Sequence, residues 1–303
     1  MNAFSTSCPL RIAVIGVGGI GSTFAFHLAS RGGHEVMVIA RPGSDRLRQL
    51  LADSGIVSTK GEHVAVGVSD KLDEDQPYDL VIVTLLAHQV DAVLPALQRS
   101  AARNILFMFN NFEPERLQDA IGTERSAFGM PFVQASFDTD GRLKAVVGAA
   151  GQKTKLSDQR WVDLFSQAGL PAVLETDMLL WLRCHAPLCV AFESISIAGV
   201  RRGTGASWKE ALNIAHGVYE SFRLVRGHGY RLYPSGKAWL DRSPAWVPAS
   251  MLWSLSRIRS FRELLATGAG ECRALIDIMA EAAPRSDKAI SVAKILAMKP
   301  ADG

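Results

Sequence analysis

A glycine-rich turn near the start of the chain is the clearest chemical signal. Gly16–Gly21 (GVGGIG) follows the apolar run Ile12–Ile15 and precedes a helical pattern. In this context the first glycine permits a tight turn, the second lets backbone approach a pyrophosphate, and the third lets helix and strand pack closely. Amides at the helix start favour phosphates. A turn without a ligand would not need three glycines in this register. We therefore expect a dinucleotide site formed by Gly16, Gly18, Gly19, Ile20 and Gly21.

An arginine follows the second predicted strand, where the ribose of a dinucleotide is usually recognised. Arg41 stands twenty residues beyond Gly21, and no carboxylate occupies the strand end. NAD sites usually carry Asp or Glu there, whereas an arginine suits the 2′-phosphate of NADP. Arg46 could assist, because guanidinium groups pair with phosphate. The sequence thus favours NADPH over NADH; the alternative is that Arg41 is a solvated loop residue.

The elements that must position this turn alternate between strand and helix in the first half of the chain. Apolar runs between helices are typical of a parallel sheet covered on both faces. A hairpin with the turn DTDG is expected to extend that sheet. The expected strands are 11–15, 35–40, 64–68, 80–85, 105–109, 126–136, 142–147 and 172–175, and the expected helices are 20–30, 90–97 and 162–168.

After about Thr176 few strand signals remain. Helical spacing predicts a helix through 212–225 that stops at Gly227–Gly229, and further helices over 252–265, 272–283 and 289–298. The predicted fold is an α/β Rossmann-type parallel-sheet domain over residues 1–176, followed by an all-α domain over residues 177–303.

Composition narrows the class of protein. The 33 basic and 30 acidic residues give a net charge of +3, which is no argument for nucleic acid. The four cysteines form no CxxC pair, so no metal site is expected. The apolar stretch 178–200 contains Arg183, His185 and Glu193, which favours a buried helix over a membrane span. The N-terminus lacks a basic region typical of a signal peptide, and we expect a cytoplasmic protein.

The order of these motifs resembles the ketopantoate reductase (2-dehydropantoate 2-reductase) family. The resemblance implies a cofactor domain and a helical domain with the active site in the cleft between them, and NADPH-dependent reduction of a 2-keto group on the route to pantothenate. It implies that Gln89 lies near the cofactor, Asn110 beside nicotinamide and substrate, and Glu271 at the substrate hydroxyl. The motifs are RIAVIGVGGIGS, GHEVMVIAR, DLVIVTLLAHQV, ILFMFNN, WLRCHAPLCVAFES and GECRALID.

The chain departs from the family pattern at positions that matter for chemistry. The family's catalytic lysine corresponds to Arg183, and the two asparagines that follow it correspond to Pro187 and Ala191. At the position of a family lysine that contacts the cofactor, this chain has Leu86. The family's asparagine-glycine pair is Asn110-Asn111 here, so the glycine is replaced by asparagine. These departures bear on the identity of the substrate.

Reduction of a ketone needs stabilisation of the carbonyl oxygen and a proton. Arginine is a poor acid, so Arg183 is expected to orient the substrate and stabilise the alkoxide, unless it forms an ion pair with Glu193 or Glu271. His185 is a candidate donor, although residues two apart on a helix point to different sides unless Pro187 distorts the turn. The alternative is that His185 has no chemical role and is a hydrogen-bonded histidine packed between helices.

Two further residues have alternatives that stay open. Asn110 either serves the site or forms a turn, and Glu271 either contacts the substrate or caps a helix.

These observations predict an NADPH-dependent reductase of a 2-keto acid, and a homodimer is possible. Two alternatives are a reductase of another ketone, hydroxy acid or imine, and an NADP-binding sensor without catalysis.

Overall fold

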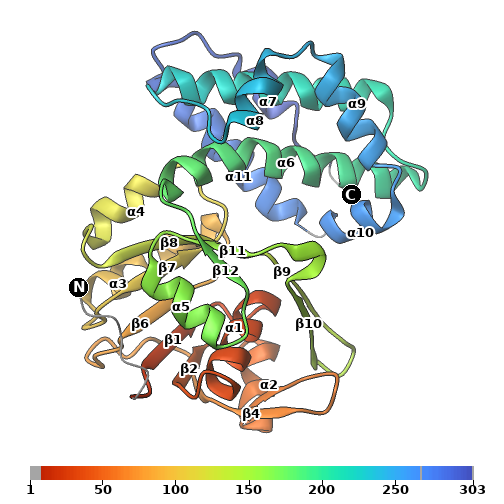
Figure 1. Cartoon of the computed structure of the whole chain (residues 1–303). Helices are drawn as coiled ribbons and strands as arrows, with labels where there is room; N and C mark the ends of the chain where they lie inside the picture. The colour runs from red at the N-terminus through yellow and green to blue at the C-terminus, as the bar shows by residue number, and fades with distance from the viewer. Residues whose placement is uncertain (1–7, 267, 302–303) are drawn as a thin grey trace. The chain divides into compact units, whose positions relative to one another are not determined.

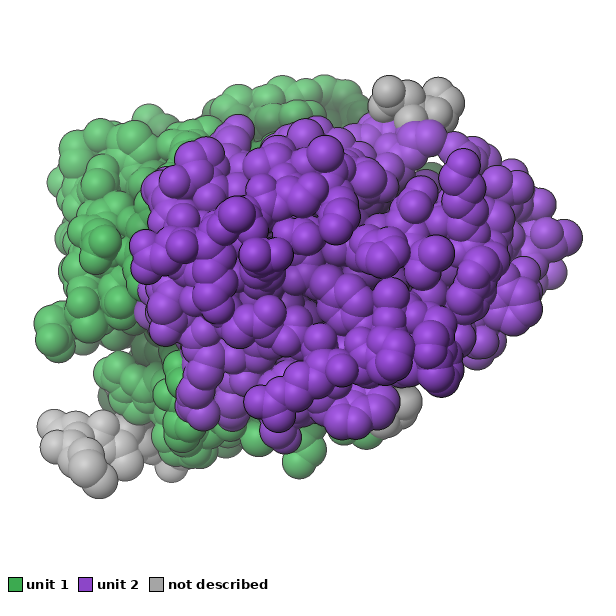
Figure 2. All heavy atoms as spheres, turned by 90° about the horizontal axis from the view of Figure 1, so that it is seen from above, with its two compact units in different colours: residues 1–109, 115–178 green, residues 110–114, 179–303 purple. Residues whose placement is uncertain are grey.

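The computed structural model describes residues 8–266 and 268–301 (Figure 1). The chain divides into two compact units, shown in separate colours in Figure 2. Unit 1 comprises residues 1–109 and 115–178, and unit 2 comprises residues 110–114 and 179–303. The sequence interpretation assigned the segment 110–114 to the first domain, but it groups with unit 2. The interpretation of the N-terminus as lacking a signal peptide concerns residues 1–7, which lie outside the described residues.

Unit 1 is built on an eight-stranded sheet with the order β12-β11-β8-β7-β6-β1-β2-β5. All pairs are parallel except β8 with β11, so the predicted parallel sheet is confirmed. The strand order reverses between β1 and β6, and such a reversal opens a crevice beyond the carboxyl ends of the two strands. The strands are β1 (Arg11–Ile15), β2 (Glu35–Ile39), β5 (Gly67–Ser69), β6 (Leu80–Val83), β7 (Ile105–Met108), β8 (Ser126–Met130), β11 (Thr154–Leu156) and β12 (Ala172–Leu174).

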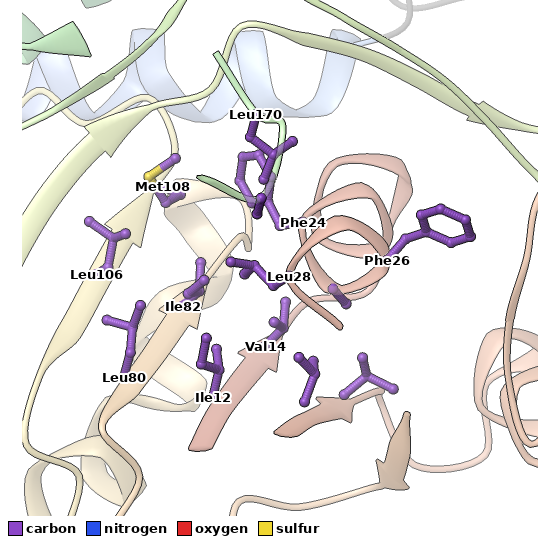
Figure 3. Packing of buried hydrophobic residues seen from close by; sticks show 14 of the residues in the cluster. Ile12, Val14, Phe24, Phe26, Leu28, Leu80, Ile82, Leu106, Met108 and Leu170 are labelled. Atoms are coloured by element: carbon purple, nitrogen blue, oxygen red, sulfur yellow. The ribbon is translucent and has the colours of Figure 1, made fainter. Parts of the chain in front are cut away.

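Helix α1 (Gly19–Ser30) is a core helix of unit 1, since every residue from Gly21 to Leu28 is buried. Phe24 and Leu28, one turn apart, are both fully buried (Figure 3). The ring of Phe24 meets Phe165 edge to face, with 5.0 Å between centroids. The other helical segments of this half are α2 (Asp45–Asp53), η1 (Ala87–Ala92), α3 (Leu94–Arg99), α4 (Pro114–Ile121), η2 (Ala149–Gly151) and α5 (Gln159–Gln167).

The expected extension of the main sheet by a hairpin is confirmed only in part. Its first strand, expected over 126–136, divides into β8, which pairs with β7 in the main sheet, and β9 (Val133–Phe137), which pairs with β10 (Leu143–Val147) in a separate two-stranded sheet. Alternate residues of both strands pack against the core of unit 1, and the backbone of Ala135 lies against Gly19 of α1. β11, which the sequence analysis missed, occupies the place beside β8. The weak strand expected over 64–68 is divided between β4 (His63–Ala65) and β5, and β4 pairs with β3 (Gly55–Val57), which the sequence analysis also missed.

Unit 2 is helical. Within the described residues, no strand follows Leu174. Its helical segments are α6 (Met178–Arg202), α7 (Trp208–Gly227), α8 (Ser235–Arg242), α9 (Trp246–Leu255), α10 (Arg259–Leu265), α11 (Ala269–Ala282), η3 (Ala283–Arg285) and α12 (Val292–Leu296).

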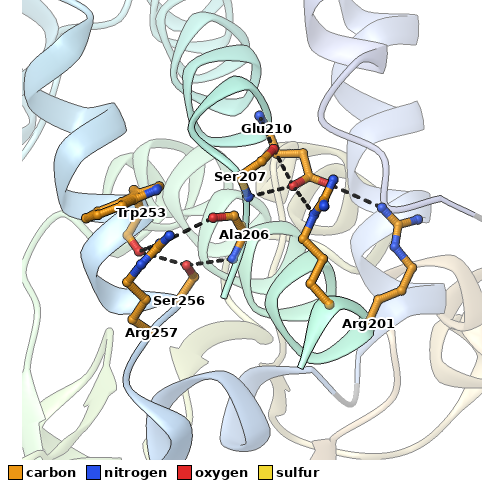
Figure 4. Close-up of polar contacts among 8 residues, drawn as sticks. Arg201, Ala206, Ser207, Glu210, Trp253, Ser256 and Arg257 are labelled. Carbon is orange, nitrogen blue, oxygen red and sulfur yellow. Dashed lines mark hydrogen bonds and ion pairs between the residues drawn. The ribbon is translucent and has the colours of Figure 1, made fainter. Parts of the chain in front are cut away.

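The single helix expected over 252–265 is wrong, because the chain breaks between α9 and α10. The hydroxyl of Ser256 accepts a hydrogen bond from the amide of Ala206 at 3.0 Å, and the Arg257 guanidinium donates to the Ala206 carbonyl at 3.2 Å (Figure 4). These bonds connect the break to the start of α7, where Ser207 and Glu210 form a capping box. A tertiary contact therefore ends a helix whose apolar pattern would have continued.

Helix α6 is the longest helix among the described residues. Its length and composition would suffice to cross a membrane, but 67% of its most apolar window is buried within the structure. Burial of this kind is typical of a core helix, as the sequence predicted. The helix is not interrupted at Pro187, so the distortion that would bring Arg183 and His185 to one face is not observed.

The contact between α1 and α5 predicts a large stability loss in Phe24→Ala. Removing this fully buried ring should lower the free energy of unfolding by about 3–5 kcal/mol. Leu51→Ala on α2, where the side chain is 56% exposed, should change it by less than about 1 kcal/mol. Urea denaturation measures both. Equal effects would contradict the packing described here.

Candidate functional site

The turn between β1 and α1 is held by contacts that require glycine. Gly16 has φ of +93°, which L side chains rarely adopt. Its carbonyl accepts a hydrogen bond from the Thr84 hydroxyl at 2.6 Å. A Cβ atom at Gly21 would lie 2.2 Å from the same carbonyl oxygen. The conformations are those expected of the motif, and Thr84, which follows β6, is a supporting residue that the sequence analysis missed.

The start of α1 offers its backbone donors. Gly18 is the N-cap residue, no side chain caps the helix there, and the first turn contains no acidic residue. A Cβ atom at Gly18 would meet nothing within 4 Å. The backbone of Gly18, Gly19 and Ile20 is therefore open to a ligand at a helix end that favours negative charge.

A cavity of about 870 Å³ lies against this turn within unit 1. Its volume is in the range of cofactor sites. It is lined by Gly16 and Gly18 of the turn, by Arg41 and Arg46 after β2, and by residues of the segment after β6. The glycine turn and both predicted arginines therefore share one cavity, at the reversal of strand order.

The two arginines differ in their surroundings. Arg41 is exposed at the end of β2. The guanidinium of Arg46 lies 4.2 Å from the centroid of the Phe137 ring and donates to the Ser22 hydroxyl at 3.0 Å. Burial lowers the pKa of Arg46 to about 10, so it still carries its charge at neutral pH. Phe137 is on the hairpin, and nothing in the sequence pointed to it.

Gln89 lies in η1, the segment after β6. Its side-chain oxygen accepts a hydrogen bond from the Leu86 amide at 3.2 Å, and both residues line the cavity. Leu86 provides no charge where the family pattern has lysine, so the guanidinium groups of Arg41 and Arg46 are the cationic side chains among the described residues of the lining.

Asn110 and Glu271 are far apart in the sequence but meet in unit 2. The Asn110 amide nitrogen donates to a carboxylate oxygen of Glu271 at 3.3 Å. Asn110 is 7% exposed, and its amide oxygen has no hydrogen-bond partner among the described residues. Asn111 forms the turn, because its side chain accepts from the Glu113 amide at 2.9 Å. The side chain of Asn110 is thus not used in that turn.

A second glutamate of unit 2, Glu193, is affected by the charge of Glu271. Glu193 of α6 is 9% exposed, and burial together with the charge of Glu271 raises its pKa to about 8. The Cys189 thiol lies 3.6 Å from one of its oxygens. The sequence analysis named Glu193 as a charged residue inside an apolar stretch and as a possible ion-pair partner of Arg183, but not as a site residue.

Arg183 and His185 are held by aromatic rings. Arg183 is 4% exposed, and its guanidinium lies 4.2 Å from the Tyr230 ring centroid and 5.5 Å from that of Phe112. The His185 ring stacks on Trp181 with centroids 4.3 Å apart. Because α6 is continuous, the two side chains leave it in different directions. Their catalytic roles stay predictions.

Among residues 8–266 and 268–301, no group of three or more His, Cys, Asp or Glu side chains could hold a metal ion.

Comparison with known proteins agrees with the resemblance drawn from the motifs. Residues 12–159 match the family described as "Ketopantoate reductase PanE/ApbA". A 2-dehydropantoate 2-reductase of Bacillus subtilis (strain 168) is 33% identical over 104 residues, which are 33% of each chain. The match thus spans about a third of that relative's length.

Solved structures resemble the chain over nearly its whole length. A PanE/ApbA family ketopantoate reductase from Ralstonia eutropha JMP134 has a TM-score of 0.73 at 19% identity, with 96% of each chain covered. A D-mandelate dehydrogenase in complex with NADH has a TM-score of 0.70 at 14% identity, covering 95% of this chain and 96% of that one. At these identities the likeness supports the fold.

The turn predicts opposite effects for two of its glycines. Gly18→Val should change the free energy of unfolding by less than about 0.5 kcal/mol, because the new side chain meets open space. It should weaken binding of a nicotinamide dinucleotide at least about tenfold by projecting into the cavity. Gly21→Ala should instead destabilise the protein by about 1–3 kcal/mol through its clash with Gly16.

Calorimetry measures dinucleotide binding by both variants, and thermal denaturation measures their stability. If Gly18→Val bound the dinucleotide as tightly as the unaltered protein, the turn would not be the binding element.

Proposed function

Because this chain belongs to the ketopantoate reductase (PanE/ApbA) family through residues 12–159, we propose that it reduces a 2-keto acid to a 2-hydroxy acid with NADPH. The observation that carries the proposal is the glycine turn facing a cavity of about 870 Å³ that also holds Arg41 and Arg46. The turn supplies backbone donors and no side chain to obstruct a pyrophosphate. These features fit a dinucleotide.

When bound, the reduced dinucleotide supplies a hydride to the carbonyl carbon of the substrate. The amides of Gly18, Gly19 and Ile20 hold its phosphates, and Gln89 lines the same cavity. Substrate contacts come from unit 2. Asn110 and Glu271 offer an amide and a carboxyl group for the oxygen that is reduced, and their hydrogen bond aligns them for it.

Arg183 acts as a permanent cation in this proposal. Its guanidinium is desolvated and rests against the rings of Tyr230 and Phe112. A planar guanidinium is suited to a carboxylate or a developing alkoxide, and it does not give up its proton. It therefore binds and orients a keto acid, and the proton must come from another group.

The preference for NADPH follows from the charges near the end of β2. Arg41 lies where NAD sites usually carry a carboxylate, and Arg46 adds a second positive charge in the same cavity. Of the two acidic residues that line it, Asp45 forms an ion pair with Arg48. Two guanidinium groups favour the additional phosphate of NADPH.

The substrate class is a 2-keto acid, with ketopantoate as one member. Leu86, Arg183, Pro187 and Ala191 depart from the family pattern, which supports testing other substrates. One similar structure is D-mandelate dehydrogenase with NADH and anilino(oxo)acetate. Aromatic 2-keto acids therefore belong in the test, along with other ketones and imines. The pantothenate pathway, the cytoplasmic location and the homodimer stay predictions.

A panel of 2-keto acids with NADPH tests the reaction through loss of the absorbance of the reduced nicotinamide. We expect turnover of at least one 2-keto acid, and a loss of kcat of at least about 100-fold in Arg183→Ala, because the substrate oxygen loses its cation. Turnover of ketopantoate supports the family's own reaction. Turnover of another ketone or of an imine, without turnover of ketopantoate, supports a reductase with a different substrate. Tight NADPH binding without any turnover would identify a sensor, and an unchanged rate in Arg183→Ala would remove its role.

Replacing Arg41 by alanine tests the choice of cofactor. The Kd for NADPH should rise about 10- to 100-fold, since one charge-assisted contact to phosphate is lost, while the Kd for NADH should change less than about threefold. Calorimetry with both dinucleotides measures this. Arg48→Ala, whose arginine does not line the cavity, is the control. Equal losses for NADPH and NADH would show that Arg41 does not read the 2′-phosphate.

A further inference from the structure

The turn of the β9–β10 hairpin lies against helix α2, beside the cavity at the glycine turn (Figure 1). The side-chain nitrogen of Gln49 on α2 donates to the Asp140 carbonyl at 2.7 Å. Gly141 has φ of +72°, and a Cβ atom there would overlap the Gln49 side chain. This close approach brings two hairpin residues, Phe137 and Gly141, into the lining of the cavity.

The hairpin and helix α1 together hold the guanidinium of Arg46, which is in the first turn of α2. The guanidinium lies 4.2 Å from the centroid of the Phe137 ring. One terminal nitrogen donates to the Gly141 carbonyl at 3.3 Å, and the other donates to the Ser22 hydroxyl at 3.0 Å. Ser22 is fully buried and donates in turn to the Val17 carbonyl of the glycine turn at 3.1 Å. Arg46 is therefore fixed by three contacts from two elements outside its own helix.

These contacts leave Arg46 with donors and charge to spare. A guanidinium has five N–H donors, and the two hydrogen bonds use two of them. Its Nε atom is buried and has no hydrogen-bond partner in the described part of the chain. Burial lowers the pKa of Arg46, the charge of Asp53 opposes this shift, and no carboxylate of residues 8–266 and 268–301 forms an ion pair with it. A half-buried cation of this kind that lines a cavity is suited to bind an anion there.

The position of Arg46 favours one phosphate of a bound dinucleotide over the others. The pyrophosphate is served by the open amides of Gly18 and Gly19 at the start of α1. Arg46 follows β2, at whose end the adenosine ribose is usually recognised. Its anchor Ser22 lies one helical turn beyond Gly18, because the Ser22 amide donates to the Gly18 carbonyl. The anion that fits this place is the 2′-phosphate on that ribose.

Arg41, the other arginine of the lining, is not held in this way. It is exposed, and its side chain forms no hydrogen bond or ion pair within the described residues. A side chain that is already fixed loses less conformational freedom when a ligand binds. Salt also screens a half-buried charge pair less than an exposed one. Of the two arginines, Arg46 should therefore bind a phosphate more strongly.

We propose that the β9–β10 hairpin is part of the site that selects NADPH, because through Phe137 and Gly141 it holds the Arg46 guanidinium where it binds the 2′-phosphate. Arg46 contacts the cofactor directly, whereas Phe137 acts through Arg46 and is a positioning residue. Arg46 supplies a larger share of the preference than Arg41. This role rests on the proposed function, since it concerns the cofactor of that reaction.

Calorimetry of Arg46→Met with NADPH and NADH tests the direct contact. Methionine keeps an unbranched apolar stem but has neither the charge nor the donors. The Kd for NADPH should rise about 10- to 100-fold, and by more than in Arg41→Ala, while the Kd for NADH should change less than about threefold. An unchanged Kd for NADPH would overturn the proposal. Equal losses for both dinucleotides would overturn it as well, because Arg46 would then contact the pyrophosphate or the adenine.

Phe137→Leu tests whether the hairpin positions Arg46. Leucine keeps an apolar side chain against the core of unit 1 but removes the ring beside the guanidinium. The Kd for NADPH should rise at least about threefold with the Kd for NADH unchanged. In Arg46→Met, the same substitution should leave the ratio of the two Kd values as it is, because Phe137 acts only through Arg46. A ratio that still changes in the double variant would contradict the positioning role.

Val146→Ala is the matched control on the hairpin. Val146 is on β10, is 47% exposed and does not line the cavity. Both Kd values should stay unaltered in this variant, and thermal denaturation should show that every variant is folded at the temperature of the binding measurement. Loss of NADPH binding in Val146→Ala equal to that in Phe137→Leu would mean that any change in the hairpin weakens binding, and the specific role of Phe137 would fail.

Salt dependence separates the two arginines. The Kd for NADPH should rise less with ionic strength in Arg41→Ala, which retains the half-buried Arg46, than in Arg46→Met, which retains the exposed Arg41. Equal salt dependence in the two variants would contradict the larger share given to Arg46.

These measurements need no turnover, so they separate the role of the hairpin from the proposed function. If NADPH bound with the expected losses but no 2-keto acid were reduced, the role of the hairpin would stand and the proposed reaction would fail. If a keto acid were reduced with NADPH, yet Arg46→Met bound NADPH as tightly as the unaltered protein, only the role of the hairpin would fail. No binding of NADPH by the unaltered protein would overturn both.

Discussion

The close approach of Gly16 and Gly21 is the constraint on which the architecture of unit 1 depends. The carbonyl oxygen of Gly16 occupies space that a side chain at position 21 would need, and it accepts the hydroxyl hydrogen of Thr84. One atom thereby links the end of β1, the start of α1 and the segment after β6. This arrangement places open amides at the reversal of strand order, where ligands of parallel sheets bind.

Unit 2 combines two ways of burying charge. The Arg183 guanidinium lies against aromatic ring faces, which replace part of its hydration. Glu193 takes the other route, because burial and the charge of Glu271 raise its pKa to about 8 and so favour its neutral form.

Much of the fold could be predicted from the sequence because the local hydrophobic patterns were strong. Apolar runs between turn residues marked β1, β2, β6 and β7, and helical spacing marked α1 and α7. The errors occurred where a distant contact determined the outcome. The hairpin β9–β10 packs beside α1 and does not extend the main sheet, and the bonds from Ser256 and Arg257 to Ala206 separate α9 from α10.

The residues of the candidate site likewise fall into those that the sequence predicts and those that only the tertiary structure identifies. The amino-acid order by itself determined the glycine turn, the arginine after β2 and the substitution at position 183, because these depend on residue type and spacing along one segment. Only the tertiary structure brought Phe137 against Arg46, Asn110 to Glu271, and Gly268 against the carboxyl group of Glu193. Proton affinity depends on burial and on neighbouring charge, and both arise only when segments distant in the chain pack together.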